Sequence, residues 1–203
     1  MINYNNKFKN LLSINWALLK KFLMLFIFFI ALSFFLSYLI KPNIHDFLNL
    51  ADRHNKLEIT SDSLTKFVQY SINNGLKVPF QMLLLSLIPL PFLYFFPVIL
   101  TAIVTGIVLY IPFMAELAGK VSFSNILLGL LPHIIIEVFG FLIVACGAYY
   151  INQSIRSKLF KKIPIQMTFI ASINHFLLTY CLVALPSFII AAFIEAFITP
   201  LFS

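Results

Sequence analysis

The sequence predicts an all-α membrane protein, a bundle of about five transmembrane helices with a cytoplasmic N-terminus and an extracellular C-terminus. Of its 203 residues, 61% are hydrophobic and only 10% are charged, whereas about one quarter of the residues in a soluble domain are charged. Several apolar runs approach the roughly 20 residues that cross a bilayer as a helix. No internal repeat of the transporter kind is found, so residues 1–203 are predicted to form a single transmembrane domain.

The first span is predicted over residues 22–40 and the segment before it contains four lysines and no acid, which places the N-terminus in the cytoplasm. Trp16 lies at the depth of an interfacial anchor. The polar stretch 41–62 has nearly balanced charges and is predicted to be an outside loop. Its histidines, His45 and His54, are interpreted as solvated loop residues rather than metal ligands.

The middle of the chain contains one ambiguous helix. Residues 92–113 and 126–151 are clear spans, but 64–90 mixes apolar residues with lysine, asparagine and glutamine. Residues 152–162 carry four basic residues and no acid, and are predicted to be a cytoplasmic loop. An even number of crossings must separate two cytoplasmic segments, so 64–90 is needed as a span. The last span follows over 167–200.

The charge and the cysteines exclude some function classes. The net charge of +7 comes from basic residues beside apolar segments, which indicates contact with membrane lipid rather than nucleic acid. Cys146 and Cys181 both lie in apolar runs and are interpreted as small apolar residues, with no disulfide or metal role. The phenylalanine-rich runs are interpreted as lipid-facing.

Ionisable residues inside the apolar runs are the candidate functional residues, because a charged group in the bilayer costs several kcal/mol. Pro132, His133 and Glu137 lie in the fourth span, and His133 and Glu137 share one helix face because they are four residues apart. At about 1.5 Å per residue, Glu195 in the last span reaches a similar depth.

Two interpretations of these residues are open. His133, Glu137 and Glu195 could bind zinc with one position left for water, as in a membrane metallopeptidase. The H-E-x-x-H spacing of zinc peptidases is absent, however. The preferred interpretation is a buried polar cluster that fixes helix packing, with Asn73 and Asn74 as further members and no cofactor.

Three other polar sites are interpreted structurally. Asn73-Asn74-Gly75 is a predicted kink or close-packing point, although a binding notch is the alternative. Thr105-Gly106 is a predicted small-residue contact between helices. Asn174-His175, at the inner end of the last span, is expected to reach interfacial water.

Three stretches resemble the stage II sporulation protein M (SpoIIM) family of membrane proteins. These are Phe67 to Gly75, with its double asparagine; Leu131-Pro132-His133 with Glu137; and Ala191 to Pro200, the closest match. The resemblance covers about residues 20–203. The chain has Thr105-Gly106 where the family often has asparagine-glycine, and Ile134 where it has glycine, which indicates altered packing.

The resemblance implies a bacterial cell membrane protein that works with other membrane or envelope proteins. Members take part in sporulation machinery, and others accompany circular bacteriocins. The predicted function is therefore an accessory or scaffold component of a cell-envelope or bacteriocin maturation or export complex. The alternatives are a metal-dependent peptidase or peptide-joining enzyme using His133, Glu137 and Glu195, and a small transporter or immunity protein. A peptide substrate and a homo-oligomer are open possibilities.

Overall fold

The computed structural model describes residues 4–42, 62–114, 123–160 and 166–201. Throughout these ranges the regular secondary structure is helical, which confirms the all-α class. The apolar runs become helices because a helix satisfies its own backbone hydrogen bonds, as a membrane requires.

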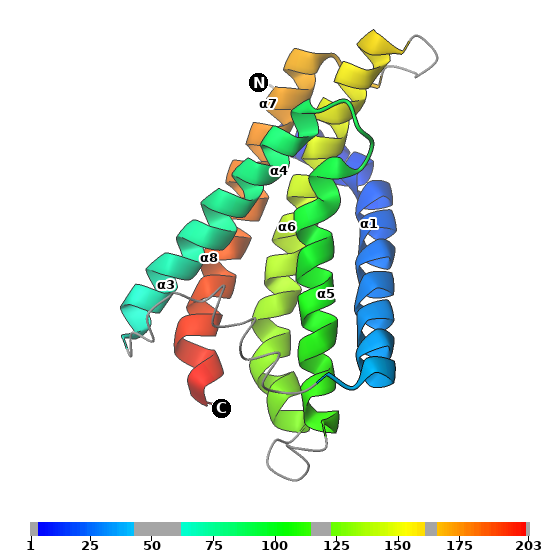
Figure 1. Cartoon of the computed structure of the whole chain (residues 1–203). Coiled ribbons are helices and arrows are strands. Elements are labelled where there is room, and N and C mark those ends of the chain that lie inside the picture. The colour runs from blue at the N-terminus through cyan, green and yellow to red at the C-terminus, as the bar shows by residue number, and fades with distance from the viewer. Residues whose placement is uncertain (1–3, 43–61, 115–122, 161–165, 202–203) are drawn as a thin grey trace.

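In the described ranges the helical elements form five successive passages, which run up and down the molecule in turn (Figure 1). The first is α1, Tyr4–Ile40, and the fourth is α6, Phe123–Leu159, which lies centrally. The second is continuous and consists of α3 Ser63–Ile72, the π-helical turn η1 Asn73–Lys77 and α4 Val78–Leu87. The third consists of η2 Leu93–Phe95, α5 Phe96–Tyr110 and η3 Ile111–Phe113. The fifth consists of α7 Phe169–Thr179, the π-helical turn η5 Tyr180–Ala184, α8 Leu185–Phe193, the π-helical turn η6 Ile194–Ile198 and η7 Thr199–Leu201.

Among the described residues, four helices are long and apolar enough to cross a membrane: Trp16–Ile40, Leu93–Phe113, Leu131–Leu159 and Phe169–Leu201. The second passage, Ser63–Leu87, is not one of the four. It nevertheless presents an exposed row of large apolar side chains at every fourth position, formed by Leu64, Val68, Ile72, Leu76, Phe80 and Leu84. We call this row the apolar stripe. An apolar face along the whole passage is what a lipid-facing helix needs.

The start of this passage is set by a capping residue. Asp62 accepts hydrogen bonds from the Thr65 hydroxyl, at 3.0 Å, and from the Leu64 N–H, at 3.3 Å. These bonds satisfy donors that the first turn of a helix leaves unpaired. They also hold the pKa of the Asp62 carboxyl below its ordinary value.

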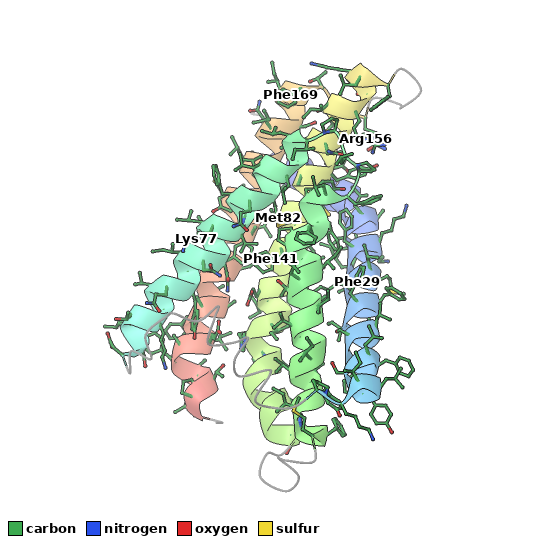
Figure 2. The ribbon with its side chains drawn as sticks, viewed as in Figure 1. Phe29, Lys77, Met82, Phe141, Arg156 and Phe169 are labelled. Carbon is green, nitrogen blue, oxygen red and sulfur yellow. The ribbon has the colours of Figure 1, made fainter. Side chains whose placement is uncertain are left out.

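The core is built around the second half of α6. Phe141 and Phe188 contact each other with ring centroids 4.8 Å apart, and Phe22 stacks on Phe95 at 4.9 Å. Met82 from α4 is also completely buried here, and Figure 2 shows it beside Phe141. The phenylalanine-rich runs are therefore not only lipid-facing, because each contributes rings from one helix face to the core.

Prolines explain why the second and fifth passages contain π-helical turns. Pro79 has no N–H, and its ring would collide with the Gly75 carbonyl in a regular α-helix. The backbone widens into η1 just before Pro79, and the Tyr180 hydroxyl donates a hydrogen bond to the Gly75 oxygen. Pro186 likewise follows η5. The helix therefore continues past each proline, and at Pro79 the freed carbonyl of Gly75 has another partner.

Two predicted boundaries need correction. The predicted cytoplasmic loop 152–162 is wrong as a loop, because α6 continues to Leu159. Polar side chains such as Asn152 and Ser154 do not end the helix, since they are buried against neighbouring helices. The first helix also begins long before residue 22. Most of the predicted outside loop, including His45 and His54, lies outside the described residues.

Candidate functional site

His133 is buried, with 6% of its surface exposed, and it joins the fourth and fifth passages. Its Nδ1 lies 3.3 Å from the Thr199 hydroxyl oxygen, and that hydroxyl donates a hydrogen bond of 3.0 Å to the Gly129 carbonyl. A threonine hydroxyl has one proton to donate. Because the Thr199 proton goes to the Gly129 carbonyl, the His133 Nδ1 must be the donor to the Thr199 oxygen. In the neutral ring Nε2 is then the unprotonated, basic nitrogen.

The π-helical turn η6 brings Thr199 to this position. The Thr199 N–H donates to the Ile194 carbonyl, five residues earlier, instead of the usual four. The wider turn precedes Pro200, which cannot donate a backbone hydrogen bond. The threonine-proline ending of the last helix therefore positions the residue that contacts His133.

Glu137 lies one turn along from His133, and both line a cavity of about 350 Å³ between α5 and α6. Thr101 and Thr105 of α5 also line it, but their hydroxyls donate to carbonyls of their own helix at 3.1 and 2.8 Å. The remaining walls are aliphatic. The polar groups that this cavity offers to a ligand are thus the His133 ring and the Glu137 carboxyl.

Glu195 lies in η6 and is half-buried. The turn that carries it contacts both α3 and α6. It does not line the cavity that His133 and Glu137 share. Within the described ranges, no hydrogen bond reaches either carboxyl group.

The three candidate zinc ligands do not converge as the metallopeptidase interpretation requires. Within the part of the chain that the structure describes, no three histidine, cysteine, aspartate or glutamate side chains lie close enough to hold one metal ion. His133 and Glu137 offer two donors in one cavity, while a catalytic zinc site in a protein uses three. The geometry therefore supplies a polar pair and a neighbouring carboxylate.

Asn73 and Asn74 lie apart from this pair, on the second passage. Their side chains hydrogen-bond to each other at 2.9 Å, and Asn73 is exposed. Asn73 belongs to a row at every fourth position, one residue further along than the apolar stripe, which comprises Gln69, Asn73, Lys77 and Gln81. We call this row the polar stripe (Lys77 is labelled in Figure 2). The five residues predicted as one buried cluster thus occupy two places, and only His133 is fully buried.

Glycines fall where the passages meet. At Gly106 of α5, a methyl group would collide with the Ser33 hydroxyl and the Ile30 carbonyl of α1. Gly106 therefore occupies a small-residue contact. At Gly75 a methyl group would meet Leu185 and Phe188 at 3.4 and 3.8 Å, which is ordinary contact.

Sequence reasoning missed Asn152 of α6, whose side chain contacts three backbone carbonyls. Its amide nitrogen lies 2.6 Å from the Ile88 carbonyl and 3.2 Å from those of Ser86 and Leu90. These carbonyls belong to the turn around Pro89, where the second passage ends and the backbone leaves the helix. The available signal was an asparagine placed directly after an apolar run, since a buried amide needs hydrogen-bond partners.

His175 is buried, with 6% of its surface exposed, so the expectation that it reaches interfacial water is wrong. Neither ring nitrogen has a hydrogen-bond partner among the residues that the structure describes. Its ring meets the edge of Tyr150 with centroids 5.3 Å apart. Asn174, the next residue, is exposed.

The comparisons with known proteins agree with the family resemblance. The protein-family model described as SpoIIM, Stage II sporulation protein M, matches residues 22–200. That range contains His133, Glu137, Glu195, Asn73 and Asn74. No curated protein and no solved structure matches the chain.

Proposed function

Because this chain belongs to the SpoIIM family of membrane proteins, we propose that it is a non-enzymatic accessory or scaffold subunit of a membrane complex. Its partner is another membrane protein, which binds along the polar stripe of α3, η1 and α4. The setting follows the family resemblance: a cell-envelope machine, or the maturation or export of a circular bacteriocin.

One observation carries this proposal: the second passage exposes an apolar and a polar row side by side. Leu76 is 55% exposed, as a lipid-facing residue would be, while Asn73, Lys77 and Gln81 are exposed on the adjacent row. Lipid tails offer no hydrogen bonds to such side chains, and an exposed lysine in the bilayer costs several kcal/mol. A partner that covers the polar stripe removes this cost.

The proposed topology has five crossings with the N-terminus in the cytoplasm. The start of α1 and the end of α6 lie at the same end of the molecule, and the C-terminus lies at the opposite end (Figure 1). That shared end contains Lys20, Lys21, Arg156 and Lys158, in agreement with the bias of basic residues toward the cytoplasm. In this topology Asn73 and Lys77 lie near the middle of the second crossing.

The charge of the polar stripe indicates the chemistry of the partner. Lys77 is its only ionisable residue, and amide groups lie on both sides of it. The complementary surface is a transmembrane helix with a carboxylate opposite Lys77 and hydrogen-bonding side chains opposite Asn73 and Gln81. The partner is thus recognised by polar contacts, while the apolar stripe continues to face lipid.

Site-directed photo-crosslinking in membranes of the native host tests this proposal. A crosslinker in place of Gln81 should capture one protein, and a crosslinker in place of Leu84 on the apolar stripe should capture lipid. Lys77→Met should abolish the protein adduct, whereas Leu76→Met, the matched control on the adjacent row, should preserve it. Lipid adducts alone from both positions would contradict the proposal.

One observation favours the enzymatic alternative: His133 and Glu137 line the same cavity. A zinc peptidase or peptide-joining enzyme would need Glu195 to complete the ligand set. Elemental analysis of the purified protein, together with His133→Ala and Glu137→Gln, separates the two functions. Stoichiometric zinc that both variants lose would favour the enzyme over the scaffold.

A further inference from the structure

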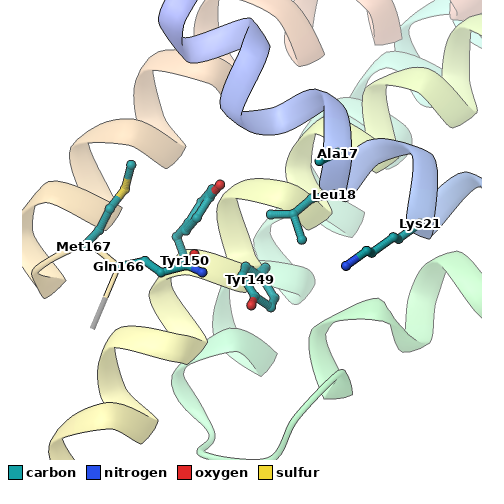
Figure 3. Close-up of a pocket in the computed structure, with 7 residues that line it drawn as sticks. All are labelled: Ala17, Leu18, Lys21, Tyr149, Tyr150, Gln166 and Met167. Carbon is teal, nitrogen blue, oxygen red and sulfur yellow. The ribbon is translucent and has the colours of Figure 1, made fainter. Parts of the chain in front are cut away.

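A second cavity, of about 480 Å³, lies at the basic end of the molecule (Figure 3). Its walls come from α1, from α6 and from Gln166 and Met167, which lie just before the N-cap residue of α7. The polar side chains that line it are Lys21, Tyr149, Tyr150 and Gln166. We propose that this cavity binds the phosphate group of an anionic phospholipid. This site is separate from the polar stripe and does not depend on the proposed partner.

The polar groups of the cavity are available to a ligand. The hydroxyls of Tyr149 and Tyr150 form no hydrogen bond within the described part of the chain, and neither is sealed from solvent. In Figure 3 the Lys21 side chain extends toward Tyr149 from the opposite wall. An ammonium group, two hydroxyls and an amide are all donors, which suits the acceptor oxygens of a phosphate.

The two tyrosines are held in place by their neighbours. The Tyr149 ring contacts Tyr150 edge to face at 5.5 Å and Phe22 at 6.5 Å. Tyr150 also contacts the buried His175 ring at 5.3 Å. Fixed rings keep the hydroxyls in position, so binding loses less side-chain entropy than it would with mobile donors.

Within the described ranges, no carboxylate lines the cavity beside Lys21. The sequence contains no aspartate or glutamate in residues 1–45 or 138–194, which together supply every wall of the cavity. Lys20, beside Trp16, and Arg156 and Lys158, in the last turn of α6, increase the positive charge near the cavity. An anion is therefore attracted by several cations, and no acid among the described cavity residues repels it.

The depth of the cavity favours a lipid over a soluble anion. Two candidate spans begin at Trp16 and Phe169, beside the cavity. The Lys20 ammonium lies over the Trp16 ring at 5.6 Å, and the Lys158 ammonium over the Phe169 ring at 5.8 Å, a pairing typical of the headgroup layer. Apolar side chains complete the walls, and a glycerol backbone with the first acyl carbons would contact them.

Native mass spectrometry of the full chain released from nanodiscs tests the site. The discs contain equal amounts of phosphatidylglycerol and phosphatidylcholine with the same acyl chains, in about 150 mM salt. The wild type should retain one phosphatidylglycerol molecule in preference to phosphatidylcholine. Lys21→Gln should weaken that binding about tenfold. Lys20→Gln, the matched control outside the cavity, should weaken it by no more than about twofold.

Further outcomes decide between the sources of the phosphate. The double variant Tyr149→Phe, Tyr150→Phe keeps both rings but removes both hydroxyls, and it should also lose the bound lipid. This variant tests the site even if Lys21→Gln fails to fold. Equal losses in Lys21→Gln and Lys20→Gln would reduce the effect to general surface charge and overturn the proposal. Displacement of the lipid by millimolar inorganic phosphate would assign the cavity to a soluble anion and would also overturn it.

Discussion

The two halves of α6 differ in how they are packed, although both are apolar. From Val138 to Ser154 almost every residue is buried, whereas from Leu131 to Glu137 only His133 is. The first group contacts α1, α4, α7 and α8 and forms the core. The second contains the polar pair that lines an open cavity. Stability and the candidate site therefore lie in different halves of one helix.

The largest expected effect comes from Asn152→Leu in the buried half. Three backbone carbonyls around Pro89 lose their donor, so the free energy of unfolding should fall by about 3 kcal/mol. Unfolding in mixed detergent micelles measures this change. Asn174→Leu, at an exposed asparagine, is the control and should have little effect. An equal fall in the free energy of unfolding in both variants would show that the Asn152 hydrogen bonds do not stabilise the fold.

Gly106→Ala is expected to have the next largest effect, a loss of about 1–3 kcal/mol. The added methyl group collides with the Ile30 carbonyl and the Ser33 hydroxyl, so α1 must move away from α5. Gly75→Ala is the matched control, because a methyl group there makes only ordinary contacts. That control should be neutral or slightly stabilising, since alanine favours a helix over glycine. The reverse order in thermal unfolding would contradict the packing described for both glycines.

A smaller effect is expected for Thr199→Val, which keeps the side-chain shape. It removes the hydroxyl that joins the Gly129 carbonyl and His133, and should cost about 1 kcal/mol. Thr101→Val removes a hydroxyl that bonds only within its own helix, and should cost less. A double-mutant cycle with His133→Ala measures the coupling between the two residues. A coupling energy of zero would mean that the fifth passage is not tied to His133.

The smallest effect on stability is expected for Glu137→Gln, within about 0.5 kcal/mol. Among the described residues nothing donates a hydrogen bond to this carboxyl, which lines a cavity, so the substitution breaks no hydrogen bond. Chemical denaturation of the variant beside Asn152→Leu compares the two halves of α6 directly. A loss as large as that of Asn152→Leu would remove the distinction between them.

The sequence was most informative where one helix alone decides the outcome. The apolar runs predicted the helices at 64–90, 92–113 and 167–200 to within a few residues. The spacing of His133 and Glu137 placed both side chains in one cavity. Both results follow from the helical period and need no knowledge of neighbouring helices.

Contacts between passages were harder to predict. The sequence offered no rule that joins Asn152 to a turn 62 to 66 residues earlier, or Tyr180 to Gly75, 105 residues apart. The shared depth of Glu137 and Glu195 was predicted from helix rise. Only the tertiary structure shows that, among the described residues, Glu195 does not join His133 and Glu137 as a third zinc ligand. A depth estimate does not fix how far each helix is rotated.

By itself, the sequence determined the class of the protein, its family and its mostly helical chain, because composition and periodicity act locally. The tertiary structure decided which polar residues are buried and which remain exposed. The π-helical turn η6, for example, places Thr199 of the last helix against His133. These choices depend on how helices distant in the sequence pack, since a buried polar group must find its partner wherever the fold supplies one.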